Sequence, residues 1–262
     1  MTYTEVLQSQ VYDFILVFAR ISAIVAFAPV FGARSVPTRS KAFIAFTLAV
    51  AFTAFLTPLE VQTSETGAGL ILQLAGEAVI GAAIGFAASL IFEIIIFAGY
   101  IMDYMIGFGF INVVDPQSGT SISLFSFFYS FLGLILFLAV DAHHILIEAM
   151  LRGYDLIPVF GGQINEIGLE YITRMTGAIF YTGFQLAAPI FIVMFMVDFT
   201  LGVAAKTVPQ IQILVVGFPL KIGIGLIIIA LAMGPIARFI IHMMENYRDS
   251  LMWLFKYWGS GP

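Results

Sequence analysis

Ten of the ionisable side chains in or beside the apolar stretches of this 262-residue chain are candidates for chemistry. Each costs about 2.5–3.5 kcal/mol at the centre of a membrane-spanning helix, so each should face protein or water rather than lipid. The set contains acids, one base and two adjacent histidines: Asp13, Arg20, Glu77, Glu93, Asp103, Asp141, His143, His144, Glu148 and Asp198. We therefore expect many helix faces of this chain to contact other helices or other subunits.

One group of these residues has the types and the spacing for proton or metal chemistry. Asp141, His144 and Glu148 stand at i, i+3 and i+7, which places them on one face of a helix. Such a set can relay protons or hold a metal ion, and the alternative is buried hydrogen bonding between helices. Helical spacing turns His143 away from this face, so the two histidines are not expected to form a chelate. We predict no metal site, no cofactor and no catalytic residue.

A second group predicts close packing between helices. Polar and small residues recur every four positions at Glu77, Gly81, Gly85, Ser89 and Glu93. On a helix they form one slowly winding stripe, and its central Gly-x-x-x-Gly lets another backbone approach closely. We interpret this stripe as a packing seam, with a pore-lining stripe as the alternative.

The remaining buried charges are expected to be structural. Asp13 and Arg20 are two helical turns apart, about 10.5 Å along the axis, so we do not expect them to pair directly. Arg20 is instead expected to pair with another helix or subunit. Asp103 stands in a second set with the same four-residue spacing, Gly99, Asp103 and Gly107, and Asp198 is expected to pair locally with Lys206.

Composition shows that membrane helices must position these residues. Hydrophobic residues make up 61% of the chain and charged residues 10%, whereas soluble domains have roughly 45–50% and about 25%. This excludes a soluble enzyme, a nucleic-acid-binding domain and a disordered chain. The net charge of −5 offers no basic surface to a nucleic acid, and the absence of cysteine excludes disulfides and thiolate chemistry.

Six apolar runs predict an all-α, polytopic membrane protein. They cover residues 11–33, 42–58, 70–112, 121–147, 175–201 and 210–237. A membrane-spanning helix needs about 20 apolar residues, so five of these runs fit one helix each. The run 70–112 is too long for one simple span, and it is either one long kinked helix or two helices.

Two basic elbows connect apolar runs in a similar way. Residues 33–37 read ARSVP and residues 205–209 read AKTVP. The shared pattern predicts two helical hairpins, with elbows that contain Arg34, Pro37, Lys206 and Pro209. The loop 34–41 is basic and has no acid, so the positive-inside rule places it in the cytoplasm.

Four stretches of the chain carry a resemblance to a known family. They are APVFGARSVPTRSKAFIAF (28–46), GYIMDYMIGFGFINVVDPQSG (99–119), the pair His143–His144 with IPV (157–159), and DFTLGVAAKTVPQIQILVVGFPLKIGIGL (198–226). Taken in this order, they are similar to the FliR family of flagellar biosynthetic proteins over most of residues 28–237. The chain departs from the family at Asp141, where the resemblance implies Asn or Gly.

The resemblance implies a subunit of the export gate of type III secretion, and not an enzyme. FliR-like proteins join FliP and FliQ as stacked helical hairpins in the bacterial inner (cytoplasmic) membrane, within the flagellar basal body. FlhB and FlhA-like components act nearby, and unfolded flagellar proteins are the cargo. We expect one domain of a hetero-oligomer in contact with membrane lipid, with FliP-like hairpins over 1–174, a FliQ-like hairpin over 175–237 and a tail over 238–262.

The resemblance also implies that the loop after the third run helps to plug the closed channel. The loop residues are Phe110, Ile111, Asn112, Val113, Val114, Asp115, Pro116, Gln117, Ser118 and Gly119. A Gly-containing polar loop between apolar helices can swing aside as substrate passes. Two alternatives stay open: an injectisome export subunit of the same family, and a secondary transporter or proton channel that uses Asp141, His144 and Glu148.

Overall fold

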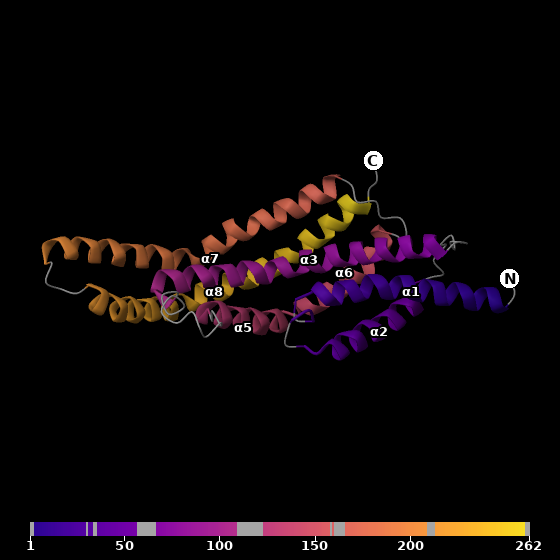
Figure 1. Cartoon of the computed structure of the whole chain (residues 1–262), viewed down its shortest axis with the longest axis horizontal. Coiled ribbons are helices and arrows are strands. Elements are labelled where there is room, and N and C mark those ends of the chain that lie inside the picture. The colour runs from indigo at the N-terminus through magenta and orange to yellow at the C-terminus, as the bar shows by residue number, and fades with distance from the viewer. Residues whose placement is uncertain are drawn as a thin grey trace. The chain divides into compact units, whose positions relative to one another are not determined.

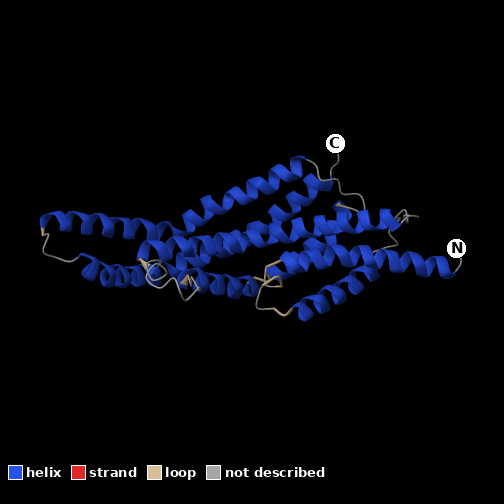
Figure 2. Ribbon diagram, in the orientation of Figure 1, coloured by secondary structure: helices blue, strands red, loops and turns tan. Residues whose placement is uncertain are grey.

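The computed structural model describes helices and the short connections between them. The described residues are 3–29, 31–33, 36–56, 67–108, 123–157, 159, 166–208 and 213–259. In chain order the helices are α1 (Tyr3–Phe27), α2 (Thr38–Phe55), α3 (Gly67–Ile106), α5 (Leu124–Ala139), α6 (Ala142–Leu156), α7 (Glu166–Thr207) and α8 (Ile213–Gly259) (Figure 1). These ranges contain no strand, which confirms the predicted all-α class (Figure 2).

Several of these helices are long enough and apolar enough to cross a membrane. Four described helices meet both criteria, and a fifth span results if α5 and α6 together form one broken span. Residues 70–106 of the long run 70–112 belong to a single helix, α3. The chain is therefore a polytopic membrane protein of the helical type.

The run 121–147, which we expected to be one helix, breaks at Val140 and Asp141. Helix α5 closes with the Val140 N–H donating to the Leu136 carbonyl at 3.0 Å. Asp141 then adopts a φ of 55°, and α6 begins at Ala142. A left-handed residue cannot continue a right-handed helix, so the expectation of one helix is wrong here.

The two C-terminal helices are longer than the apolar runs that predicted them. Helix α7 has 42 residues and α8 has 47, because both continue through polar sequence beyond the runs 175–201 and 210–237. Pro189 lies inside α7, and Pro219 and Pro235 lie inside α8. Each proline removes one backbone donor from its helix.

The chain divides into two compact units that interleave along the sequence. The first unit consists of residues 1–90, 142–175 and 246–262, and the second of residues 91–141 and 176–245. Three helices, α3, α7 and α8, therefore contribute residues to both units.

Aromatic side chains hold α2 against α1 in the first unit, where the two helices lie side by side (Figure 1). The Phe46 ring meets the rings of Phe14 and Phe18 edge-on, at centroid distances of 5.6 and 6.5 Å. Lys41, near the start of α2, donates to the Gly32 carbonyl at 2.8 Å. This contact ties the elbow that follows α1 to the first turn of α2.

Small residues let large side chains of α3 pack closely in the second unit. The Cδ1 atom of Ile95 lies 2.8 Å from the position that a Cβ on Gly133 of α5 would take. A ring carbon of Phe97 lies 2.6 Å from the corresponding position on Gly183 of α7.

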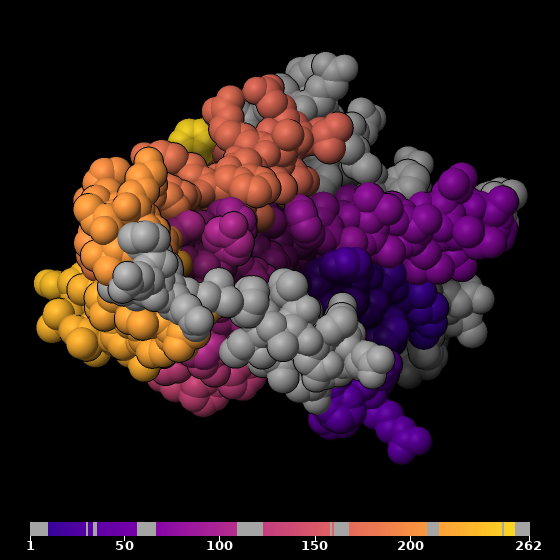
Figure 3. Space-filling view, turned by 60° about the vertical axis from the view of Figure 1, so that its left-hand side comes forward, coloured from indigo at the N-terminus to yellow at the C-terminus, as the bar shows by residue number. Residues whose placement is uncertain are grey.

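Figure 3 shows α7, in orange, next to the yellow-orange start of α8 with which it forms a hairpin.

Candidate functional site

A buried arginine joins three segments of the first unit. Arg20 of α1 is 1% exposed, and its Nε lies 2.5 Å from Oε2 of Glu77 of α3, which is also 1% exposed. The Nη1 atom of Arg20 donates to the Ile157 carbonyl at 2.8 Å. The guanidinium carbon lies 4.4 Å from the centroid of the Tyr154 ring of α6. Arg20 thus pairs with another helix and connects α1 to α3 and to the end of α6.

In this arrangement the charges of Arg20 and Glu77 compensate each other, so the cluster does not supply a free acid or base. The guanidinium of Arg20 uses its planar face and its N–H groups at once, which an ammonium cannot do. Glu77 and Arg20 neutralise each other in a site that water does not reach, and such a pair is stable only when both partners are present. The cluster therefore fixes how α1 and α3 align.

Neighbouring polar contacts extend the cluster along α1 and α3. The Tyr12 hydroxyl donates to Oε1 of Gln73, which is buried. The Tyr154 hydroxyl donates to the Val17 carbonyl at 3.4 Å. Our sequence reasoning missed Gln73, although it precedes Glu77 by four residues and so extends the spacing of the predicted seam.

The middle of the predicted seam lies against the backbone of α1. A Cβ on Gly81 would be 2.2 Å from the Arg20 carbonyl oxygen, and one on Gly85 would be 2.7 Å from the Ile24 carbonyl oxygen. Only a residue without a side chain fits at this distance, because the neighbouring atoms are backbone. Glu77, Gly81 and Gly85 therefore share the face of α3 that contacts α1.

The last two residues of the predicted seam do not share that contact. Ser89 donates to the Phe86 carbonyl of its own helix at 2.8 Å, and Glu93 is exposed and belongs to the second unit. A four-residue repeat drifts by about 40° per step, so Glu93 lies about 160° around the helix from Glu77.

A buried carboxylate organises the end of α3 and the start of α5 in the second unit. Asp103 is 5% exposed and accepts a hydrogen bond from the Ser123 hydroxyl. It also accepts from the backbone N–H of Phe125 at 3.1 Å and from that of Ser126 at 3.4 Å. A negative charge at a helix N-terminus satisfies the free N–H groups there and complements the helix dipole.

Glycine allows α3 and α5 to touch at this point. A Cβ on Gly99, one turn before Asp103, would be 2.3 Å from the Ser126 Cα. The Ser126 hydroxyl donates to the Ile96 carbonyl at 3.1 Å. The two backbones are therefore in direct contact beside Asp103.

The predicted plug, Phe110–Gly119, lies outside the described residues, but both flanks of it are described. On one flank, α3 closes at Gly107, which has a φ of 100° and donates to the Asp103 carbonyl at 3.1 Å. Across the two flanks, the rings of Phe108 and Phe125 meet edge-on at a centroid distance of 5.6 Å.

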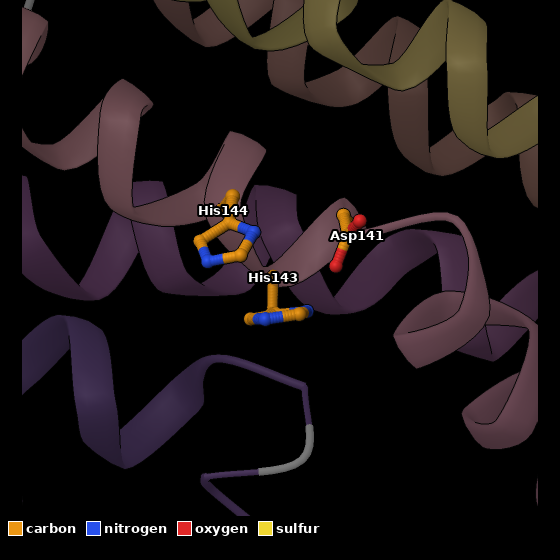
Figure 4. A group of neighbouring side chains, drawn as sticks. All are labelled: Asp141, His143 and His144. Atoms are coloured by element: carbon orange, nitrogen blue, oxygen red, sulfur yellow. The ribbon is translucent and has the colours of Figure 1, made fainter.

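The histidine pair lies closer to Asp141 than the spacing suggested. Asp141, His143 and His144 each offer one ligand atom, and these atoms lie within 4.8 Å of one another (Figure 4). The centroids of the two imidazole rings are 4.1 Å apart. The Nδ1 atom of His143 is buried without a hydrogen-bond partner. His143, which we expected to point away from the group, is thus part of it.

The predicted face of Asp141, His144 and Glu148 does not form as one helical stripe. Asp141 stands outside α6 in a left-handed conformation, so helical spacing does not apply to it. Glu148 pairs with Arg152, one turn further along α6, at 2.7 Å, and both side chains are substantially exposed.

Asp198 pairs with a different lysine from the one that we expected. Asp198 pairs with Lys221 of α8 at 2.8 Å, because Lys206 is eight residues, or about 12 Å, further along its own helix. Lys206 is exposed in the last turn of α7, and Pro37 directly precedes α2. Arg34 and Pro209 lie outside the described residues.

Comparison with known proteins identifies relatives of this chain. The family described as "Bacterial export proteins, family 1" matches residues 11–247. The "Flagellar biosynthetic protein FliR" of Bacillus subtilis is 35% identical over 85% of this chain and 86% of its own length. The protein of the same name from Escherichia coli is 30% identical over 87% of this chain and 86% of its own. The chain belongs to the FliR family.

Membership of the FliR family makes the chain a component of the flagellar export apparatus and, with its apolar helices, a membrane protein. The match begins inside α1 and ends inside α8, so it includes the Arg20–Glu77 pair and Asp103. A FliR-family protein from Caulobacter vibrioides, 29% identical, is covered over 95% of its own length. The resemblance therefore extends over the full set of described helices.

Proposed function

We propose that this FliR-family chain joins FliP-like and FliQ-like chains to build the export gate in the bacterial inner membrane, at the base of the flagellum. Unfolded flagellar proteins pass through this gate, and FlhB- and FlhA-like components act beside it. The single observation that carries the proposal is the match of residues 11–247 to a family of bacterial export proteins. In this proposal, residues 1–174 take the place of FliP-like hairpins and residues 175–237 that of a FliQ-like hairpin.

Exposed apolar surface supports an assembly of several chains. Large apolar side chains of α7 are half-exposed or more, among them Phe180, Tyr181, Ile192, Phe195 and Phe199. Large apolar side chains that are this exposed mark contact with lipid or with another protein. Both contacts are expected for a subunit of a membrane gate.

The loop Phe110–Gly119 is proposed as the plug that closes the channel at rest and yields during export. Its position between α3 and α5, with both flanks held in the second unit, supports this role. A plug needs a fixed attachment, because a segment attached to loose ends would not return to the same place after each passage.

Deletion of residues 110–119 tests this proposal. The variant is expressed with the FliP-like and FliQ-like chains, the complex is purified, and its ion conductance is measured in a planar bilayer. We expect complexes of unchanged composition that conduct ions at rest, whereas complexes with the intact chain stay closed. Assembled complexes that remain closed without these residues would overturn the plug.

A further inference from the structure

We infer that Asp141, His143 and His144 form a binding site for a divalent transition metal ion of the zinc class, at the break between α5 and α6. The inference goes beyond the proposed function, which involves no metal. Our sequence-based prediction of no metal site assumed that His143 turns away from the other two side chains. In the structure, all three potential ligand atoms lie within 4.8 Å of one another.

The donor types in this group match such an ion. Two imidazoles and one carboxylate are ligands that zinc, cobalt and nickel accept, whereas calcium and magnesium prefer oxygen donors alone. The whole chain contains three histidines and no cysteine. Two of the three histidines therefore stand together beside a carboxylate, and the third, His242, lies on α8 next to Glu245.

The break between the helices positions the ligands, because it takes Asp141 out of helical geometry. Asp141 has a φ of 55°, and α6 begins at Ala142. In a continuous helix, position 143 would lie about 160° around the axis from position 141, and the two side chains could not share an ion. Figure 4 shows the three side chains gathered at the start of α6. All three belong to four consecutive residues, so the site is local to this break.

The ring of His143 supplies a second, independent observation. Its Nδ1 atom is buried and makes no hydrogen bond. A buried polar atom costs free energy unless a partner compensates for the hydration that it loses. Ligation of a metal ion through Nδ1 would supply that partner. The His144 ring is close enough to bind the same ion, with a centroid distance of 4.1 Å.

Modest side-chain rotations complete the site. With metal–ligand distances of about 2.0–2.2 Å, the ligand atoms around a tetrahedral ion are about 3.4 Å apart. Atoms that now lie within 4.8 Å of one another therefore need to approach by up to about 1.4 Å. Asp141 and His144 are exposed, which leaves room for this movement. Three protein ligands leave the fourth position of the ion open to water.

Zinc binding to the full chain tests the inference. The chain is purified in detergent with a tag that lacks histidine, together with any co-expressed chains that accompany it. It is stripped with a chelator and dialysed against Zn²⁺, and bound zinc is measured by elemental mass spectrometry. We expect His143→Ala or His144→Ala to remove one zinc ion per chain and to weaken binding at least about 100-fold, because loss of residues that merely support a ligand already costs 10–100-fold.

Two further variants sharpen the test. Asp141→Asn keeps the shape and the left-handed preference of the residue but removes its charge, and it should weaken zinc binding at least about tenfold. His242→Ala is the matched control, because it removes an exposed histidine outside the group, and it should leave zinc content unchanged. Zinc should also raise the melting temperature of the intact chain and of His242→Ala but not that of His144→Ala, since an ion that binds only the folded state stabilises it.

Three results would overturn the site. The first is an intact chain that binds no more zinc than the double variant His143→Ala with His144→Ala. The second is unchanged zinc binding by His144→Ala, whose exposed side chain can be removed without disturbing the core. The third is displacement of the zinc by Ca²⁺ or Mg²⁺, which would mean that oxygen ligands hold it. None of these results bears on the export gate, which the plug deletion and the co-purification test separately.

Discussion

Arg20 shows how a chain this apolar tolerates charge at the scale of a single residue. Its guanidinium is buried, yet it has a carboxylate, a backbone carbonyl and an aromatic face as partners. Each partner replaces part of the hydration that the charge loses on burial. Removing one partner of the ion pair is therefore destabilising, because the other charge is then left buried and unpaired.

Removal of either member of the Arg20–Glu77 pair should therefore be costly. We expect Arg20→Met or Glu77→Met to lower stability by about 3–5 kcal/mol, and the double variant to recover most of this loss, since no charge is then left unpaired. Thermal unfolding of the purified complex in detergent measures the difference. Arg174→Ala is the control, because Arg174 and Glu170 are 77% and 72% exposed, and such a pair is worth about 1 kcal/mol or less.

Two results would contradict this account of Arg20. The first is a double variant as unstable as the worse single variant, which would mean that volume rather than charge matters. The second is full stability of Arg20→Lys, since a lysine cannot bond to Glu77 and Ile157 while it covers Tyr154.

Asp141 gives a second test, at a site where the backbone conformation determines which residue types are tolerated. Its φ of 55° is a left-handed value, which Gly adopts freely, Asn adopts readily and β-branched residues adopt only with strain. We expect Asp141→Gly to keep or raise stability by up to about 1 kcal/mol and Asp141→Val to lower it by about 1–3 kcal/mol. The same thermal measurement applies, and equal effects of Gly and Val would contradict a left-handed residue here.

Sequence reasoning at the residue scale was right about burial for only part of the set and did not identify the partners: Asp141, His144 and Asp198, which we also expected to be buried, are exposed. The apolar surroundings of Arg20 and Asp103 were visible in the sequence, and both residues are buried. Their partners were not visible, because Glu77 is 57 residues from Arg20 and Ser123 is 20 residues from Asp103. The Asn or Gly expected at position 141 did hold a clue, since both residues favour the left-handed conformation that breaks the helix there.

At the scale of elements, the contact between α1 and α3 depends on two glycines. Gly81 and Gly85 each face a backbone carbonyl of α1, and backbone atoms cannot move aside as a flexible side chain can. Small residues let two helices approach until their backbones touch, and the close van der Waals packing that results is one of the forces that associate helices in lipid.

Gly81→Ala should separate these two helices. We expect a loss of about 1–3 kcal/mol, because the added methyl group overlaps the Arg20 carbonyl. Gly76→Ala is the matched control in the same helix, since nothing lies within 4 Å of its added Cβ, and it should be neutral or stabilising by up to about 1 kcal/mol. Yield and melting temperature of the complex measure both variants, and equal effects would contradict the seam.

Apolar runs predicted the class and the approximate positions of the helices better than their number and their ends. The run 70–112 became α3 and the runs near the C-terminus became α7 and α8, because period and length are properties of the local sequence. The break at Val140–Asp141 was missed, because hydropathy continues across it. The ends of α7 and α8 were missed because polar residues form helices as readily as apolar ones do.

At the scale of the whole molecule, the proposed assembly predicts dependence on other chains. Expressed alone, the chain should aggregate or be degraded, because large apolar side chains such as Tyr181, Ile192 and Phe199 are more than half exposed. Expressed with FliP-like and FliQ-like chains, it should purify in a complex of defined mass. A stable, well-dispersed monomer that ignores those chains in detergent would contradict the proposal.

The length of α3 has a consequence for how this protein can sit in a bilayer. Its 40 residues measure about 60 Å at 1.5 Å per residue, twice the roughly 30 Å of hydrocarbon. To fit entirely between the headgroups it would need to lean by about 60°, far beyond the roughly 40° that membrane helices reach. A large part of α3 must therefore lie outside the hydrocarbon layer, and other helices of this same chain already bury most of its most apolar stretch.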